Sequence, residues 1–188
     1  MIHIILLAAG SSRRFGEDKL LWPVDGKPMI CHTLEKLVAL SSKHSWDVTV
    51  VTKEGSVHEL TKEYPVSVCL NPDHESGISS SIKCSLSNLP NDALPAIFFV
   101  ADQPWLESET IESFILGFLD SGRLCACVTH DGESGNPCIF SAPLFDELMQ
   151  LSGDKGGKKI IMHHFDECYK FEVANPLQLK DLDTKPTL

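Results

Sequence analysis

The most constraining feature of the chain lies at its start, where an apolar run is followed directly by small, polar and basic residues. The run extends from Ile2 to Ala9 and is rich in Ile and Leu, which is typical of a central parallel strand buried on both faces. Gly10 follows, and because it lacks a Cβ atom a ligand can approach its backbone closely. Groups suited to phosphate come next, from Ser11, Ser12, Arg13, Arg14 and Lys19. The segment therefore predicts a strand that leads into a phosphate-binding loop.

Two common nucleotide-binding loops do not fit this segment. The spacing of Gly10, Gly16 and Lys19 differs from G-x-x-x-x-G-K-[ST], and the chain has no G-x-G-x-x-G. An ordinary strand-to-helix turn with solvated arginines is the alternative. Two arginines and a lysine behind one buried strand favour the phosphate-binding loop over that alternative.

The stretch LAAGSSRRFGEDK resembles the L-A-[AG]-G-x-S-x-R-[MF]-G-x-x-K signature of the MobA/MocA-like NTP transferases, which complete the molybdenum cofactor. The resemblance implies a three-layer α/β/α Rossmann-like domain with a mostly parallel sheet, of the nucleotide-diphospho-sugar transferase type. It also implies that the loop binds the nucleotide, through Leu7, Ala8, Ala9, Gly10, Ser12, Arg14 and Lys19.

Length and charge limit the classes of function. The chain has 188 residues, of which 43% are apolar, so we expect one domain over residues 1–188. A net charge of −10 argues against nucleic acid as a partner, because nucleic-acid binding depends on neutralising phosphates with Lys and Arg. Positive charge is concentrated at the loop and again at Lys155, Lys158 and Lys159, which suits a small anionic substrate.

The seven cysteines include no C-x-x-C pair, so the sequence indicates neither a disulfide framework nor a zinc site. We expect reduced thiols and a cytoplasmic location. A cleavable leader and a run of about 18 apolar residues are both missing, which predicts a soluble protein without a membrane segment.

Apolar periodicity predicts alternating strands and helices, as in a parallel sheet with helical crossovers. The predicted strands cover Asp47–Thr52, Val66–Leu70, Ala96–Ala101, Leu124–Thr129 and Glu167–Val173, and the predicted helices begin near Pro28, Glu54, Ser108 and Pro143. The segment His130–Pro137 is predicted to be a loop.

The segment after the predicted strand Val66–Leu70 is polar, and ligands gather at the carboxyl ends of strands in open α/β sheets; two later blocks also resemble family motifs. The first, NPDHESGISSS, matches N-P-x-x-x-x-G-x-x-x-S, and the resemblance implies that Asn71, Gly77 and Ser81 lie near the base and ribose. The block GNPCIF resembles G-x-P-[VA]-x-[FL], which implies contact with the acceptor. GDKGGK resembles G-D-x-G-[AG]-R, although Lys158 replaces the final Arg and offers a point charge in place of a forked contact.

Asp102 follows a buried strand directly, and a carboxylate there is costly unless it meets a cation or donors. It lies too far from the helix near Ser108 to cap it. We therefore expect Asp102 to bind Mg²⁺, and the matching family motif D-[QMT]-P implies the same role. The segment KDLDT resembles D-[IL]-D-T-P-E-D, which offers Asp183 as a second metal ligand.

His163 and His164 are adjacent, and neighbouring side chains on a helix point about 100° apart. The spacing therefore predicts that the two imidazoles do not ligate one metal, and that they are solvated or hydrogen-bonded histidines.

These residues predict nucleotidyl transfer from an NTP to a phosphomonoester, with Arg14, Lys19 and Asp102 as catalytic groups and without a covalent nucleophile. The family resemblance implies molybdopterin as acceptor and a molybdoenzyme or its chaperone as a further partner. Ala9 resembles the branch that uses CTP, with GTP second. The alternatives are a sugar-phosphate nucleotidyltransferase and a non-catalytic nucleotide-binding module; an oxidoreductase would need a dinucleotide glycine fingerprint.

Overall fold

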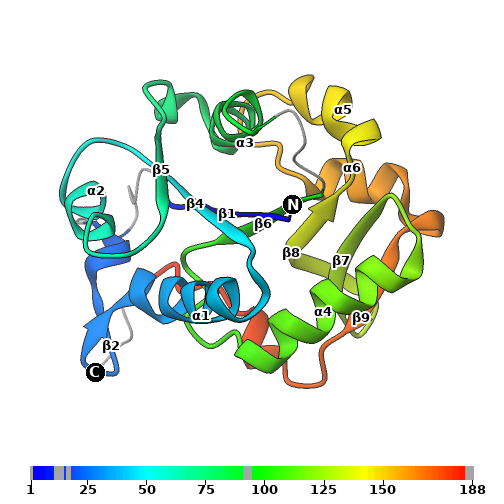
Figure 1. The fold of residues 1–188 in the computed structure, drawn as a ribbon, viewed down its shortest axis with the longest axis horizontal. Coiled ribbons are helices and arrows are strands. Elements are labelled where there is room, and N and C mark those ends of the chain that lie inside the picture. Colours follow the sequence, from blue (N-terminus) through cyan, green and yellow to red (C-terminus); the bar gives the residue numbers. More distant parts are fainter. Residues whose placement is uncertain (1, 11–14, 16–17, 91–94, 185–188) are drawn as a thin grey trace.

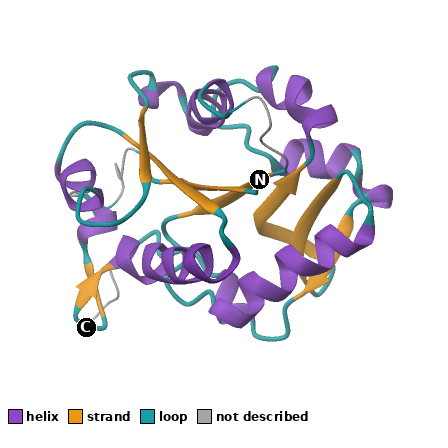
Figure 2. Ribbon diagram, in the orientation of Figure 1, coloured by secondary structure: helices purple, strands orange, loops and turns teal. Residues whose placement is uncertain are grey.

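The computed structural model describes residues 2–10, 15, 18–90 and 95–184. Its main feature is a seven-stranded sheet with helices on both faces (Figures 1 and 2). The strand order is β5-β4-β1-β6-β8-β7-β9, and β8 is antiparallel to both of its neighbours while the other pairs are parallel. The strands are β1 (His3–Leu7), β4 (Asp47–Thr52), β5 (Ser67–Leu70), β6 (Ala96–Val100), β7 (Cys125–His130), β8 (Glu133–Phe140) and β9 (Tyr169–Glu172). The predicted three-layer fold with a mostly parallel sheet is confirmed.

The first strand is the centre of the parallel part of the sheet. β1 pairs with β4 on one side and with β6 on the other, and four of its five residues are buried. A strand covered on both faces needs apolar side chains on both, which explains the continuous apolar run in the sequence.

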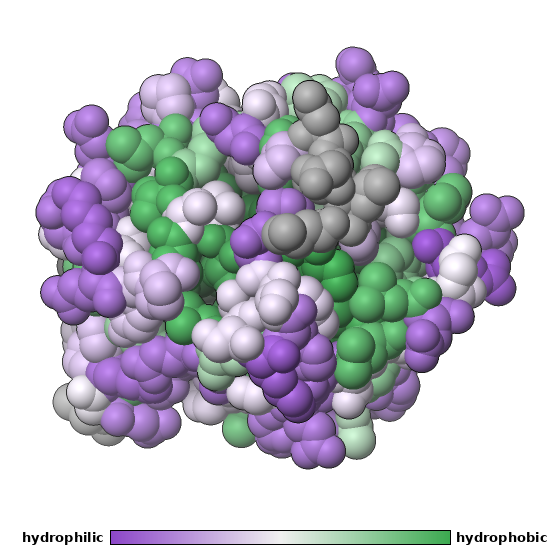
Figure 3. All heavy atoms as spheres, viewed as in Figure 1, coloured by the Kyte–Doolittle hydropathy of each residue, from purple (hydrophilic) through white to green (hydrophobic). Residues whose placement is uncertain are grey.

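Two apolar clusters fill the spaces on either side of the sheet. One lies under α1 (Met29–His44) and α4 (Ser108–Ser121), and the other under α3 (Ile78–Ser87), α5 (Phe145–Met149) and α6 (Lys158–His163) (Figure 1). Alternate residues of β1 serve the two clusters, with Ile4 in the first and Ile5 in the second. In the space-filling view, hydrophilic residues dominate the outline while apolar residues gather toward the middle of the face (Figure 3).

The remaining elements are short. They are α2 (Ser56–Thr61), a hairpin of β2 (Pro23–Val24) and β3 (Lys27–Pro28), and the 3₁₀ helices η1 (Lys19–Leu21), η2 (His74–Ser76), η3 (Ala142–Leu144), η4 (Phe165–Glu167) and η5 (Pro176–Leu179). No described helix is both long and apolar enough to cross a lipid bilayer.

The prediction of a loop over His130–Pro137 is wrong, because most of this segment belongs to β8. Only Asp131 and Gly132 form the turn, with φ of 49° and 82°, which is the positive-φ pair typical of a tight hairpin. Pro137 is accommodated because the β7–β8 register shifts between Cys127 and Val128, and strands tolerate proline at such irregularities. The Gly, Asn and Pro residues of this strand therefore gave a misleading loop signal.

Candidate functional site

The carboxyl ends of β1 and β6 open into a cavity of about 530 Å³. The two ends lie side by side, since the Ala101 amide donates to the Leu7 carbonyl at 3.2 Å. The cavity is lined by Leu7, Ala8, Ala9, Gly10, Phe15, Lys19, Leu20, His74, Glu75, Gly77, Ile78, Ser81, Val100, Ala101, Asp102, Asp154 and Asp183. A Cβ atom on Gly10 would meet no atom of the described residues within 4 Å, so its backbone is open to a ligand with respect to that part of the chain.

A lysine flanked by two carboxylates forms the polar centre of the cavity. Lys19 Nζ lies 2.7 Å from Asp102 Oδ2 and 2.9 Å from Asp183 Oδ1. The side chains of Lys19 and Asp102 are only 17% and 20% exposed, whereas that of Asp183 is 58% exposed. Three segments far apart in the sequence thus place their charged groups around one point.

The pKa of Lys19 is set by the competition between burial and the two neighbouring carboxylates. Burial lowers the pKa, but hydrogen bonds to Asp102 and Asp183 and the charges of both carboxylates outweigh burial and leave the pKa raised. The ammonium is therefore held in its charged form by its neighbours.

Helix α1 supports the segment after β6. Thr33 Oγ1 donates to the Gln103 carbonyl at 3.2 Å, and Lys36 Nζ donates to the carbonyls of Pro104 and Leu106 at 2.9 and 2.7 Å. Burial, followed by the charge of Lys27, lowers the pKa of Lys36. These contacts fix the backbone that carries Asp102, without supplying a charge to the cavity.

Asp183 reaches the cavity because the C-terminal segment is bonded to the same backbone. The Leu182 amide donates to the Asp102 carbonyl at 3.0 Å, and Gln103 Nε2 donates to the Leu179 carbonyl and to Asp181 Oδ1 at 3.0 and 2.9 Å. Partial burial, followed by the negative charge of Asp102, raises the pKa of Asp181. Three carboxylates therefore gather around one ammonium.

A family model described as a MobA-like NTP transferase domain matches residues 4–168 of the chain. The chain belongs to the MobA-like NTP transferase family.

Relatives of this MobA-like chain carry several names. A probable molybdenum cofactor guanylyltransferase of Pyrococcus horikoshii is 36% identical over 65% of this chain and 59% of its own length. The purine catabolism protein PucB of Bacillus subtilis is 24% identical over 96% of this chain and 90% of its own length. The match to the Pyrococcus relative thus spans less than two thirds of that protein.

Solved structures show the same fold. Rv0371c of Mycobacterium tuberculosis H37Rv is 22% identical, with a TM-score of 0.79 over 97% of this chain and 92% of that one. A second structure of the same protein is described as a complex with manganese, with 19% identity and a TM-score of 0.71 over 93% of this chain and 88% of that one.

Most of the predicted nucleotide-binding residues of this MobA-like domain line the cavity. Leu7, Ala8, Ala9, Gly10 and Lys19 do so, together with Gly77 and Ser81. Ser12 and Arg14 lie outside the described residues. Their nucleotide contacts, like those of the other predicted residues, stay predictions.

Gly77 is required by a close approach between two cavity segments. Its φ is +89°, and a Cβ atom there would lie 2.4 Å from the Gly153 carbonyl carbon and 2.6 Å from Asp154 Oδ1. The Ser79 amide donates to the Gly153 carbonyl at 3.2 Å, which joins the same segments. The two family-like motifs NPDHESGISSS and GDKGGK therefore meet at Gly77.

Asn71 is buried and is not among the cavity residues. Its side-chain amide donates to Ser80 Oγ at 2.8 Å and to Ser81 Oγ at 3.0 Å. Both amide hydrogens are used in this way, so Asn71 fixes the first turn of α3 and acts on the cavity through Ser81.

The lysines of the GDKGGK block are exposed and are not among the residues that line the cavity. Asp154, which no sequence argument had singled out, lines the cavity in their place, as do His74 and Glu75. Asp181 was also missed. Asp154, His74 and Glu75 could have been noticed in the sequence because they lie close to Gly77 or Gly153. Asp181 could have been noticed because it is spaced as D-x-D with Asp183.

The residues present fit a hard divalent cation. Asp102 and Asp183 already converge on one positive charge, and the pKa of Asp181 is raised first by partial burial and then by the negative charge of Asp102. Carboxylate oxygens are the donors that Mg²⁺ and Mn²⁺ prefer.

Proposed function

We propose that the chain is a nucleotidyltransferase that transfers NMP from an NTP to a phosphomonoester and releases pyrophosphate. The observation that carries the proposal is the Lys19 ammonium, held between Asp102 and Asp183 where β1 and β6 open into the cavity. A volume of about 530 Å³ falls in the range of small-ligand sites, so a nucleotide can enter.

In the proposed reaction an oxygen of the acceptor phosphate attacks the α-phosphorus. A new P–O bond forms there, the bond to the β-phosphate oxygen breaks, and its electron pair leaves with pyrophosphate. Lys19 offsets the charge that develops on the leaving group, as predicted also for Arg14, and the open backbone at Gly10 admits the phosphates closely. Positioning and electrostatics suffice for this chemistry without a covalent nucleophile.

Asp102 and Asp183 would hold the metal ion. Bound Mg²⁺ would neutralise phosphate charge during transfer. Lys19 is now paired with both carboxylates, so in the proposed reaction the ammonium would turn toward the phosphates when the cation takes its place between them. The manganese complex of Rv0371c supports a divalent ion in this fold.

For the acceptor we propose a molybdopterin-type phosphomonoester, on the names of relatives such as the Pyrococcus protein. A molybdoenzyme or its chaperone would then receive the product. The test is mass spectrometry of products after incubation with each NTP, Mg²⁺ and molybdopterin. A molybdopterin dinucleotide supports the proposal. Pyrophosphate release only with a sugar phosphate would contradict the acceptor, and nucleotide binding without turnover would favour a binding module.

For the base, the sequence prediction of CTP rests on Ala9, whose methyl group lines the cavity where the GTP-using branch has a hydrogen. The name guanylyltransferase of relatives favours GTP instead. One contact of this kind is worth about 1 to 3 kcal/mol, which corresponds to a preference of roughly tenfold to a hundredfold. The test is a competition in which equal concentrations of CTP and GTP are supplied in one reaction and both dinucleotide products are quantified. An excess of the guanine dinucleotide would overturn the CTP prediction and leave the reaction class unchanged.

A further inference from the structure

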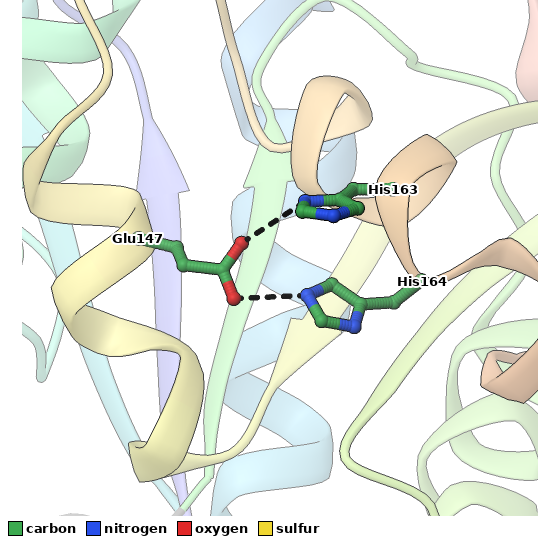
Figure 4. A group of neighbouring side chains, drawn as sticks. All are labelled: Glu147, His163 and His164. Carbon is green, nitrogen blue, oxygen red and sulfur yellow. Dashed lines mark hydrogen bonds and ion pairs between the residues drawn. The ribbon is translucent and has the colours of Figure 1, made fainter.

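Two adjacent histidines and a glutamate meet on the surface beside α5 and α6. His164 Nε2 lies 2.9 Å from Glu147 Oε1, and His163 Nδ1 lies 3.6 Å from Glu147 Oε2 (Figure 4). One ligand-type atom from each residue lies within 4.8 Å of the other two. Both rings in Figure 4 point toward the same carboxylate, which belongs to a different helix.

His164 is hydrogen-bonded to Glu147, in agreement with the sequence prediction, and the statement that His163 and His164 do not share one metal stays a prediction. It assumed that both residues are helical, but α6 ends at His163, and His164 has φ of −106° and ψ of 20°. The departure from helical geometry brings the two ring centroids to 4.9 Å. Adjacent imidazoles can therefore face one point.

We propose that Glu147, His163 and His164 bind a divalent transition-metal ion of the zinc class. Two imidazoles and one carboxylate are a ligand set that Zn²⁺ accepts, with water in the fourth position. With metal–ligand distances of about 2.0 to 2.1 Å, tetrahedral ligands lie roughly 3.4 Å apart. His164 Nε2 and His163 Nδ1 lie 2.9 and 3.6 Å from different oxygens of Glu147, so side-chain rotation has to bring both nitrogens toward the oxygen that binds the ion.

Accessibility also fits the proposal. The side chains of Glu147, His163 and His164 are 36%, 75% and 26% exposed, so an ion can enter from solvent while one imidazole is held in place. None of the three lines the nucleotide cavity. The donor atoms differ as well, because nitrogen ligands favour zinc-class ions while the carboxylates of the cavity favour magnesium.

A second group of similar residues serves as an internal control. His130, Asp131 and Glu172 also lie within 4.8 Å of one another, but this group has a single imidazole. Its Glu172 oxygens already accept from Thr129 Oγ1 at 2.6 Å and from the Asp131 amide at 2.9 Å. We expect weaker binding there.

The test is calorimetric titration of the full chain with Zn²⁺, without nucleotide and with a thiol reductant that does not chelate metals. We expect one equivalent to bind, and H163Q, H164Q and E147Q each to weaken binding by at least about tenfold. The matched control H130Q should bind as the wild type does. H163Q is the most informative variant, because a side chain that is 75% exposed can be replaced without disturbing the fold.

Cobalt distinguishes this site from the seven thiols of the chain. Co²⁺ bound by nitrogen and oxygen gives visible d–d bands without the near-ultraviolet thiolate charge-transfer band. Unchanged Zn²⁺ affinity in H163Q and H164Q, a thiolate band, or the absence of saturable binding below the millimolar range would each overturn the proposal.

Discussion

The two halves of the sheet differ in direction and in use. In the half formed by β5, β4, β1 and β6 all strands are parallel, and the residues that follow β1 and β6 line the cavity. In the half formed by β8, β7 and β9 one strand is antiparallel, and none of the described residues of these strands lines the cavity. Parallel strands bring their carboxyl ends to one edge, and that is where polar groups can converge on a ligand.

The second half nevertheless reaches the cavity through its connections. Asp154 lies between α5 and α6, and Asp183 follows the last strand along the chain. Both are carboxylates, whereas the first half supplies Lys19 together with Asp102. Under the proposed function, the parallel half would bind the phosphates while later segments adjust the charge around them.

The largest effect should come from Asp102, at the end of the parallel half. We expect D102N to keep the fold and to lower turnover by more than about a hundredfold, because the metal-binding charge is lost while side-chain size is kept. Pyrophosphate release at saturating Mg²⁺ measures this. D131N, at the exposed turn of the other half, is the matched control and should retain the wild-type rate. A near-normal rate in D102N would exclude the metal role.

The next effect concerns the contact between the halves at Gly77. G77A should lower the free energy of unfolding by about 2 to 3 kcal/mol, because the residue needs positive φ and a methyl group there meets the Gly153 backbone. G10A is the control, since a methyl group on Gly10 meets no atom of the described residues within 4 Å. It should leave stability nearly unchanged and weaken nucleotide binding. Denaturant unfolding of G77A and G10A measures the free energy of unfolding of each variant. Equal losses of stability in the two variants would show that the close contact at Gly77 is not what makes the glycine necessary.

The sequence predicted the strands of the parallel half and also β7 and β9 of the other half, but it missed β8. Continuous apolar runs such as Ala96–Ala101 have few alternatives to a buried strand, and a carboxylate directly after one is a strong signal. β8 was missed because Gly135, Asn136 and Pro137 are loop-forming residues, and only the pairing with β7 reveals the register shift that accommodates them. The assumption that His163 and His164 are both helical failed because helix ends are difficult to locate from sequence.

The candidate site was predicted only in part for a related reason. Motif residues such as Lys19 and Asp102 could be found because each follows a strand end or glycine turn. Asp154 and Asp181 lie in motif-like blocks but were not singled out, because their place depends on tertiary contacts with Gly77 and Gln103. Local patterns therefore identify groups at strand ends, whereas groups brought in by later segments require the folded chain.

A smaller effect should come from Lys19. K19M should lower kcat roughly tenfold and raise KM less, because the ammonium gains most when charge moves onto pyrophosphate. K43M, in the exposed Lys43–Glu112 ion pair, is the matched control and should leave both constants unchanged. Steady-state kinetics separate the two constants. If only KM rises, Lys19 binds substrate and transition state equally, and its proposed role in offsetting charge on the leaving group is wrong.

The smallest effect tests the charge supplied by the C-terminal segment. The pKa of Asp181 is raised, first by partial burial and then by Asp102, so folding makes protonation of this carboxylate easier than in the unfolded chain. A raised pKa contributes stability at low pH that is lost as pH rises through the folded-state pKa.

D181N removes the charge and keeps an oxygen for Gln103 Nε2. Because Asp181 is exposed overall, we expect a gain of less than about 1 kcal/mol in the free energy of unfolding at pH 7 without metal. The gain should vanish below about pH 3.5, where the wild-type carboxyl is protonated as well. Urea unfolding at the two pH values measures it. Added Mg²⁺ should reduce the difference in free energy of unfolding between D181N and the wild type, because a bound cation offsets the repulsion among the carboxylates. If D181N is less stable than the wild type at pH 7, the Asp181 charge stabilises the fold and the prediction is wrong.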